Sequence, residues 1–156
     1  MIEVTVHHLL DSTLESVDRV ECLTVELAES VGFRDTSLAH IVLAVHETTA
    51  NAVIHGNRYS REKKVSVAIS IAENQFKITI GDEGEGFDPR TIPETLSSQG
   101  LLRSHGRGVY LSRALMDEYT VQLRQAGGTE VTMIKYLQPG NLSRVNHAVE
   151  LRSDRL

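Results

Sequence analysis

Three polar residues recur at four-residue spacing in one helical stretch of the sequence: Glu47, Asn51 and His55. They project from the side of the helix that faces away from its apolar stripe, an arrangement that a solvated surface also produces. Asn51, however, is unfavourable inside a helix and has the small neighbours Ala50 and Ala52, so we expect a ligand to approach there. An Asn carbonyl oxygen suits Mg²⁺. A carboxylate one turn earlier can act as a base toward a hydroxyl that attacks a phosphate group.

An acidic, glycine-rich turn follows directly after an apolar strand pattern and contains Asp82, Gly84 and Gly86. Aspartate is common in ordinary turns, so this residue alone does not define a site. As a binding residue, it would accept a hydrogen bond from an exocyclic amine such as that of adenine. The two glycines would let the backbone approach a base and its sugar closely.

A second Gly-x-Gly pair, Gly106 and Gly108, stands where a further helical pattern opens. Backbone amides at a helix N-terminus attract phosphate groups. Arg103 or Arg107 would add positive charge at this point. We interpret His105, between them, as a loop residue and not as a catalytic one.

The composition restricts the possible functions of the chain. Its 156 residues fit one domain with a hydrophobic core of its own. A net charge of −5 argues against a nucleic-acid-binding protein, which needs a concentrated basic surface. The sequence shows neither the run of about 18 apolar residues that spans a membrane nor a secretory signal pattern. The single cysteine, Cys22, is predicted to be a small core residue, and a cytoplasmic location is expected.

Hydrophobic periodicity and turn residues predict the order strand, two helices, two strands, irregular segment, helix, two strands. The irregular segment, residues 81–105, is rich in Gly, Pro, Ser and Thr, and segments of this length are functional lids or disordered loops. The predicted strands cover residues 2–7, 64–72, 75–80, 119–125 and 129–136. The predicted helices run from about residue 12 to 32, from 35 to 56 and from about 108 to 117.

The short turns between consecutive strands require antiparallel pairing. The sequence therefore predicts an α+β fold, with a mixed, mostly antiparallel sheet and helices on one face. A Rossmann fold does not fit, because its glycines connect a strand to a crossover helix. Here Gly84 and Gly86 open a long loop instead.

Four motifs, taken in order, resemble the GHKL superfamily of ATP-binding domains: Glu47-x-x-x-Asn51, Asp82-x-Gly-x-Gly-Phe-Asp, Gly106-x-Gly108, and Gly-Gly-Thr before the last strand. The likeness extends over roughly residues 5–137. We therefore expect residues 1–137 to form one such domain, followed by a polar tail at 138–156. The resemblance implies the two-layer α/β sandwich called the Bergerat fold, with a flexible ATP lid.

Within this superfamily the segment from Glu47 to Gly56 is most similar to the small anti-sigma factor serine kinases. The resemblance implies ATP and Mg²⁺ as cofactors, with Glu47 as general base and Asn51 as Mg²⁺ ligand. It also implies that Asp82 binds the adenine amine with support from Thr129. Four glycines would shape the pocket and its lid: Gly84, Gly86, Gly106 and Gly108.

Proteins of this kind phosphorylate a serine of a STAS-domain anti-anti-sigma protein and also bind a sigma factor, usually as homodimers. The resemblance therefore implies a protein-serine kinase with these partners. Two alternatives stay open: an ATP-binding switch that acts by contact without phosphotransfer, and a kinase whose regulated target is not a sigma factor. The presence of Glu47 argues against the contact-only switch, because binding ATP needs no base.

Overall fold

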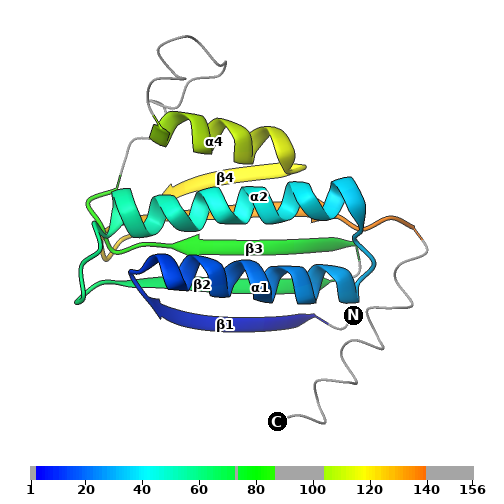
Figure 1. Ribbon diagram of the computed structural model, residues 1–156, viewed down its shortest axis with the longest axis horizontal. Helices are drawn as coiled ribbons and strands as arrows, with labels where there is room; N and C mark the ends of the chain where they lie inside the picture. Colours follow the sequence, from blue (N-terminus) through cyan, green and yellow to red (C-terminus); the bar gives the residue numbers. More distant parts are fainter. Residues whose placement is uncertain (1–2, 73, 87–103, 140–156) are drawn as a thin grey trace.

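In the part of the chain that the structure describes, five strands and three helices follow one another in the order that the periodicity predicts (Figure 1). The computed structural model describes residues 3–72, 74–86 and 104–139. The strands are β1 (Val4–Asp11), β2 (Lys64–Ala72), β3 (Gln75–Gly81), β4 (Glu118–Leu123) and β5 (Thr129–Tyr136). The helices are α1 (Leu14–Ser30), α2 (Asp35–Asn51) with the π-helical turn η1 (Ala52–Gly56) directly after it, and α4 (Ser104–Leu115).

The sheet has the order β1-β2-β3-β5-β4. All four pairings between the described strands are antiparallel. Among these strands the sheet is therefore purely antiparallel and not the mixed, mostly antiparallel sheet that the sequence predicted. Because β5 lies between β3 and β4, the last residue of β3 pairs with a residue near the start of β5, Gly81 with Glu130. This register places the turn after β3 beside the first residue of β5, and Asp82 N–H donates to the Thr129 carbonyl at 2.9 Å.

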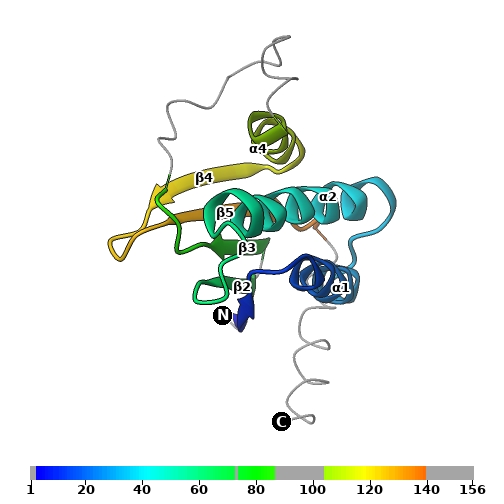
Figure 2. The same cartoon turned by 60° about the vertical axis from the view of Figure 1, so that its left-hand side comes forward.

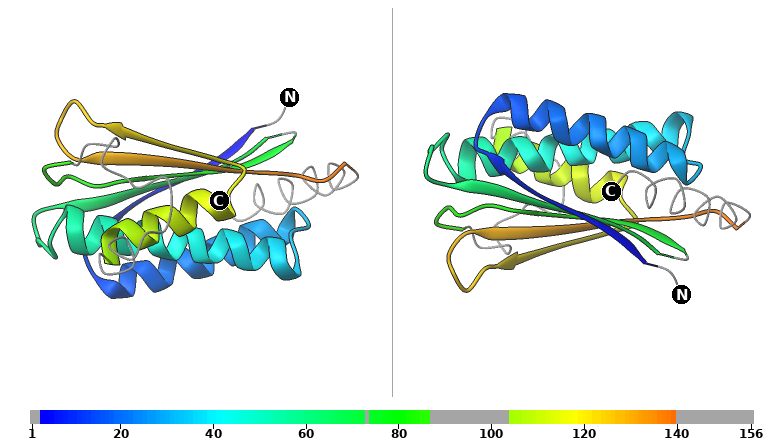
Figure 3. Two further views of the ribbon diagram at one scale, coloured as in Figure 1. Left: turned by 90° about the horizontal axis from the view of Figure 1, so that it is seen from above. Right: turned by 90° about the horizontal axis from the view of Figure 1, so that it is seen from below.

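The helices cover one face of the sheet, as predicted (Figure 3). Alternation along the central strands directs every second side chain into the core. In β2 these side chains are Val65, Val67, Ile69 and Ile71. At the far end of the core, Phe33 and Phe76 meet edge to face with ring centroids 5.8 Å apart.

Helix α2 crosses the centre of this face and carries the predicted site residues (Figures 1 and 2). Its buried stripe includes Ile41, Ala44 and Val45. Thr49 is also fully buried, and its hydroxyl donates to the Val45 carbonyl at 2.7 Å, so this polar group is satisfied within the helix. The regular helix ends at Asn51 and passes into the wider η1 turn, which closes with a hydrogen bond from Asn57 N–H to the Ala52 carbonyl at 2.8 Å.

Several details differ from the sequence predictions. Helix α4 begins at Ser104, four residues before the predicted start, so Gly106 and Gly108 lie inside its first turns and not ahead of it. Strand β1 extends to Asp11. Cys22 is exposed, so its prediction as a core residue is wrong: it lies on the outward side of α1. Residues 87–103 of the predicted lid and residues 140–156 of the predicted tail lie outside the described residues. Among the described residues, no helix is long and apolar enough to cross a membrane.

Candidate active site

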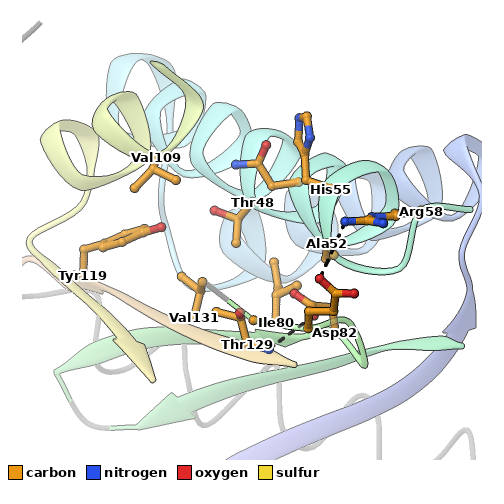
Figure 4. A pocket seen from close by; sticks show the side chains of 14 residues that line it. Thr48, Ala52, His55, Arg58, Ile80, Asp82, Val109, Tyr119, Thr129 and Val131 are labelled. Atoms are coloured by element: carbon orange, nitrogen blue, oxygen red, sulfur yellow. Dashed lines mark hydrogen bonds and ion pairs between the residues drawn. The ribbon is translucent and has the colours of Figure 1, made fainter. Parts of the chain in front are cut away.

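A pocket opens between α2 with η1 on one side, α4 on another, and the end of β3 and the start of β5 below (Figure 4). Val109 and Tyr119 lie at one end of it, and Arg58 and Asp82 lie at the other. Its apolar lining comes from Ala52, Ile80, Val109 and Val131. Its polar lining includes Thr48, Asn51, Asp82 and Thr129. An apolar pocket with a few convergent polar groups is the usual form of a small-molecule site.

Asp82 is a buried carboxylate in the lining of the pocket, with only 7% of its surface exposed. Its Oδ1 accepts hydrogen bonds from the backbone N–H groups of Gly84, at 2.9 Å, and Thr129, at 3.2 Å. Among the described residues both bonds use Oδ1, which leaves Oδ2 to accept a hydrogen from a bound molecule. Burial raises the pKa of the Asp82 carboxyl above its usual value, although these two N–H groups oppose the shift.

The turn after β3 packs against the end of α2 with no room for side chains. A Cβ at Gly84 would lie 2.2 Å from the Gly56 carbonyl oxygen, and a Cβ at Gly56 would lie 2.5 Å from Asp82 Cγ. At Gly128 a Cβ would lie 2.0 Å from the Asp82 carbonyl oxygen, and the φ of this residue is +96°. The glycines therefore bring three backbone segments into contact around Asp82. Two of these glycines, Gly56 and Gly128, had no individual role in the sequence predictions.

Glu47 and Asn51 lie together beneath α4. A Cβ at Gly108 would be 2.6 Å from Glu47 Oε2 and 3.4 Å from Asn51 Nδ2. Asn51 lines the pocket, whereas Glu47 lies one turn earlier in α2 and is not part of the lining. The glycine at 108 thus allows the α4 backbone to approach the carboxylate and the carboxamide at once.

Buried hydroxyl groups connect α4 to α2. Ser112 is fully buried, and its hydroxyl lies 2.9 Å from the Gly108 carbonyl and 3.3 Å from the Ala44 carbonyl. The Thr48 hydroxyl donates to Ser112 Oγ at 3.3 Å. These contacts fix the height of α4 above α2, and therefore the width of the pocket between them.

The structure brings most of the predicted residues together. Asn51, Asp82, Gly86 and Thr129 line one pocket, with Gly84 in the turn behind it and Glu47 and Gly108 at its edge. Gly106 lies in α4, but nothing beyond its place in the helix is described, and Arg103 lies outside the described residues. Sequence reasoning did not identify the other lining residues as part of the site, among them Thr48, Ile80, Val109, Tyr119 and Val131. Their apolar or mid-helix patterns gave no signal to separate them from ordinary core positions.

Residues 10–135 match the family model described as the histidine kinase-like ATPase domain. The chain is 30% identical over 136 residues to serine-protein kinase RsbW of Bacillus subtilis (strain 168), and the match covers 81% of this chain and 80% of that protein. It is 31% identical over 116 residues to serine-protein kinase RsbW of Staphylococcus epidermidis, with 70% and 72% covered.

Two solved structures share the fold. One is the crystal structure of the RsbU and RsbW domains of Rv1364c from Mycobacterium tuberculosis, with a TM-score of 0.61 and 23% identity over 87% of this chain. This chain corresponds to 33% of that longer one. The other is the mycobacterial sensor histidine kinase MprB, with a TM-score of 0.53 and 18% identity, covering 86% of this chain and 99% of that one.

The family model matches the chain from the end of β1 into β5, and the relatives match over most of their own length. The chain therefore belongs to the histidine kinase-like ATPase domain family, among its serine-protein kinases.

Proposed function

We propose that the chain transfers the γ-phosphate of ATP, with Mg²⁺, to a serine of a STAS-domain anti-anti-sigma protein, and that it also sequesters a sigma factor. The observation that carries the nucleotide part is the half-satisfied, buried carboxylate of Asp82 inside a glycine-lined pocket. The partners follow from the likeness to the RsbW kinases and from the sequence motifs. We further propose that the protein works as a homodimer in the cytoplasm.

In this proposal, an adenine base occupies the pocket. A flat ring would lie between the apolar side chains of Ala52, Ile80 and Val131, and its exocyclic amine would donate to Asp82 Oδ2. A guanine base offers a carbonyl oxygen at the corresponding position, which a carboxylate repels. The pocket therefore favours ATP over GTP.

The metal would be held mainly by the nucleotide. The described residues contain no group of three or more His, Cys, Asp or Glu side chains that could hold an ion alone. Mg²⁺ commonly takes one or two protein oxygens and completes its shell with phosphate oxygens and water. The Asn51 side chain, at the pocket and beneath α4, fits the role of the single protein ligand. When bound, the ion would neutralise charge on the phosphate groups.

Glu47 fits the role of general base. Its carboxylate lies against the Gly108 backbone and shares this contact with Asn51, so base and metal ligand lie side by side. A serine hydroxyl brought to this point would give up its proton to the carboxylate as its oxygen bonds to the γ-phosphorus and the bond to the β-phosphate oxygen breaks.

Asn51→Ala is expected to remove most of the effect of Mg²⁺ on ATP affinity. In the parent protein, chelating the metal should weaken ATP binding, and in the variant the ratio of the two Kd values should approach one. Calorimetric titration with Mg²⁺ and with a chelator measures this ratio. Asn74→Ala, in the turn at the other end of β3, makes the same chemical change away from the site and should behave like the parent. An unchanged ratio in Asn51→Ala would refute the assignment.

Gly84→Ala is expected to weaken ATP binding by about tenfold or more, and to lower the free energy of unfolding by about 1–3 kcal/mol. Its Cβ would meet the Gly56 carbonyl oxygen at 2.2 Å, so the turn that carries Asp82 must move. Gly127→Ala is a suitable control. It introduces strain at a φ of +96°, but its Cβ meets nothing closer than the Gly84 carbonyl oxygen at 3.7 Å. Urea unfolding and ATP titration of both variants separate the effect of backbone strain, expected in Gly127→Ala, from the effect of moving the turn, expected in Gly84→Ala.

The test of the proposed function is phosphotransfer to a STAS-domain protein encoded near this chain. The purified pair is incubated with γ-labelled ATP and Mg²⁺, and the labelled residue is located by mass spectrometry. We expect one labelled serine. We also expect the unphosphorylated STAS protein to displace a sigma factor from the kinase. ATP binding without transfer to any STAS domain would favour the contact-only switch. Transfer without capture of any sigma factor would favour a kinase with a different regulated target.

A further inference from the structure

Asn57 is a buried polar residue at the point where the chain leaves α2 and η1, and the roles proposed above do not use it. Only 1% of its surface is exposed. A buried carboxamide destabilises a fold unless its polar atoms form hydrogen bonds. The hydrogen-bond partners of the Asn57 side chain therefore show which segments of the chain it holds together.

The Asn57 side chain joins three separate segments. Its Nδ2 donates to Ser12 Oγ at 2.8 Å and to the Lys64 carbonyl at 2.9 Å, at the end of β1 and the start of β2. Its Oδ1 accepts from the Glu83 backbone N–H at 2.7 Å. Glu83 is the middle residue of the turn between Asp82 and Gly84, so this bond reaches the backbone of the candidate base-binding site.

Three of these residues close a ring of hydrogen bonds. Asn57 donates to the Lys64 carbonyl, the Lys64 N–H donates to the Glu83 carboxylate, and the Glu83 N–H donates back to Asn57. Connected polar groups that satisfy one another hold a defined geometry more firmly than isolated bonds. The ring fixes the turn after β3 relative to the end of α2.

The backbone around Asn57 departs from regular geometry. The π-helical turn η1 precedes it, and the two residues after it, Arg58 and Tyr59, both have positive φ values, of 51° and 57°. Residues with side chains rarely adopt this conformation, and consecutive ones are a sign of a conformation that the surroundings enforce. The chain thus turns sharply directly after Asn57, the residue whose side chain accepts from Glu83 N–H.

We propose that Asn57 is a positioning residue for the nucleotide site, which holds the Asp82–Gly84 turn at the distance from α2 that adenine recognition requires. The inference rests on the proposed ATP binding. Gly84 lies so close to the Gly56 carbonyl that the turn tolerates no displacement toward α2, and Asn57 prevents displacement away from it. The side chain does not touch the nucleotide. It acts through Glu83 N–H on the position of the Asp82 carboxylate.

The test compares Asn57→Ala with Ser12→Ala. Both changes remove part of the same buried network. Among the described residues, the Ser12 hydroxyl bonds to Asn57 Nδ2 and, at 2.5 Å, to the Lys63 carbonyl but not to Glu83, so the link to Glu83 stays intact. Melting temperature and the Kd values of ATP and GTP are measured for the parent and both variants. A merely structural role lowers the melting temperature without changing the ATP-to-GTP preference.

We expect Asn57→Ala to weaken ATP binding by about tenfold and to reduce the preference for ATP over GTP, because the turn loses its anchor. Ser12→Ala should lower the melting temperature and leave the ATP Kd within about twofold. Equal ATP affinity in the parent and Asn57→Ala would overturn the inference and leave the proposed function standing. Absence of ATP binding by the parent protein would overturn both.

If Asn57→Ala does not fold, Asn57→Asp provides the test. Its carboxyl oxygen can still accept from Glu83 N–H, while the donor to Ser12 and Lys64 is lost. We then expect reduced thermal stability together with an ATP Kd within about threefold of the parent value. A tenfold loss of ATP affinity in this variant would contradict a role that acts through Glu83.

Discussion

Replacement of Glu47 by alanine is expected to lower the rate of phosphotransfer by a factor on the order of 10² to 10⁴ while ATP binding changes little. The carboxylate lies beneath α4 beside Asn51 but outside the lining of the pocket. Its loss therefore removes the proton acceptor and leaves the contacts to adenine intact. Single-turnover transfer from saturating ATP measures the chemical step directly.

Glu47→Gln gives a sharper version of this test, because it keeps the size of the side chain and removes only its basicity. Glu29→Gln, on the exposed surface near the end of α1, makes the same change away from the site and should leave the rate unchanged. A rate for Glu47→Gln close to that of the parent protein would exclude Glu47 as the base. A matching loss of ATP affinity would instead indicate a binding role.

Replacement of Asp82 by asparagine is expected to weaken ATP binding by about 10- to 100-fold, because a charge-assisted hydrogen bond is lost and an N–H group faces the adenine amine. The same change should relatively favour GTP, whose carbonyl oxygen can accept from the new amide. Competition between the two nucleotides measures this change of preference. A retained preference for ATP in the variant would contradict the assigned role of Asp82.

The same substitution should stabilise the free protein near neutral pH. Burial raises the pKa of Asp82 in the folded state above the value of 3.8 expected when the chain is unfolded. The unfolded state therefore loses its proton first, and the folded state loses stability as the pH rises from about 4 through the raised pKa. Asp82→Asn removes this titration but keeps an acceptor at the Oδ1 position for Gly84 and Thr129.

Urea unfolding between pH 4 and 8 tests this expectation. The difference in the free energy of unfolding between Asp82→Asn and the parent should grow as the pH rises through this window and then level off. A difference that shrinks with rising pH would mean that the folded protein favours the charged carboxylate. Greater stability combined with weaker ATP binding would identify a residue kept for function at a cost to the fold.

The secondary structure follows from local sequence patterns to a large extent. The predicted strand at 64–72 matches β2 at both ends, and the one at 75–80 is one residue shorter than β3. Alternation of apolar residues specifies a strand wherever one face is buried. The start of α4 was placed too late, because two glycines near its beginning lower helix propensity and only its packing on α2 compensates.

The grouping of the site residues depends on topology that no local pattern contains. Glu47 and Asn51 share a helix face, which their spacing alone predicts. The contact of Asp82 with Thr129, 47 positions later, exists because β5 inserts between β3 and β4. Short-turn reasoning gives the pairing within each hairpin but not the order of the hairpins in the sheet.

Two errors have a common physical origin. Cys22 was expected inside because free cysteine is often buried, but its position on α1 falls on the outward side. Asn57 follows directly after the helix predicted at 35–56 and was assigned no role, although its side chain is among the most deeply buried polar groups of the fold. Residue type gives only an average tendency to be buried or exposed. The three residues that bond to the Asn57 side chain lie 45, 7 and 26 positions away from it in the sequence, so no local pattern reveals its burial.

The measurement that tests the central claim most directly is a crystal structure of the protein with Mg²⁺ and a non-hydrolysable ATP analogue. The account predicts that the adenine amine donates to Asp82 Oδ2 and that the base lies between Ala52 and Val131. It also predicts that Asn51 binds the metal and that the γ-phosphate lies near Glu47. A nucleotide bound elsewhere, or one whose base does not contact Asp82, would contradict the assignment of this pocket as the ATP site.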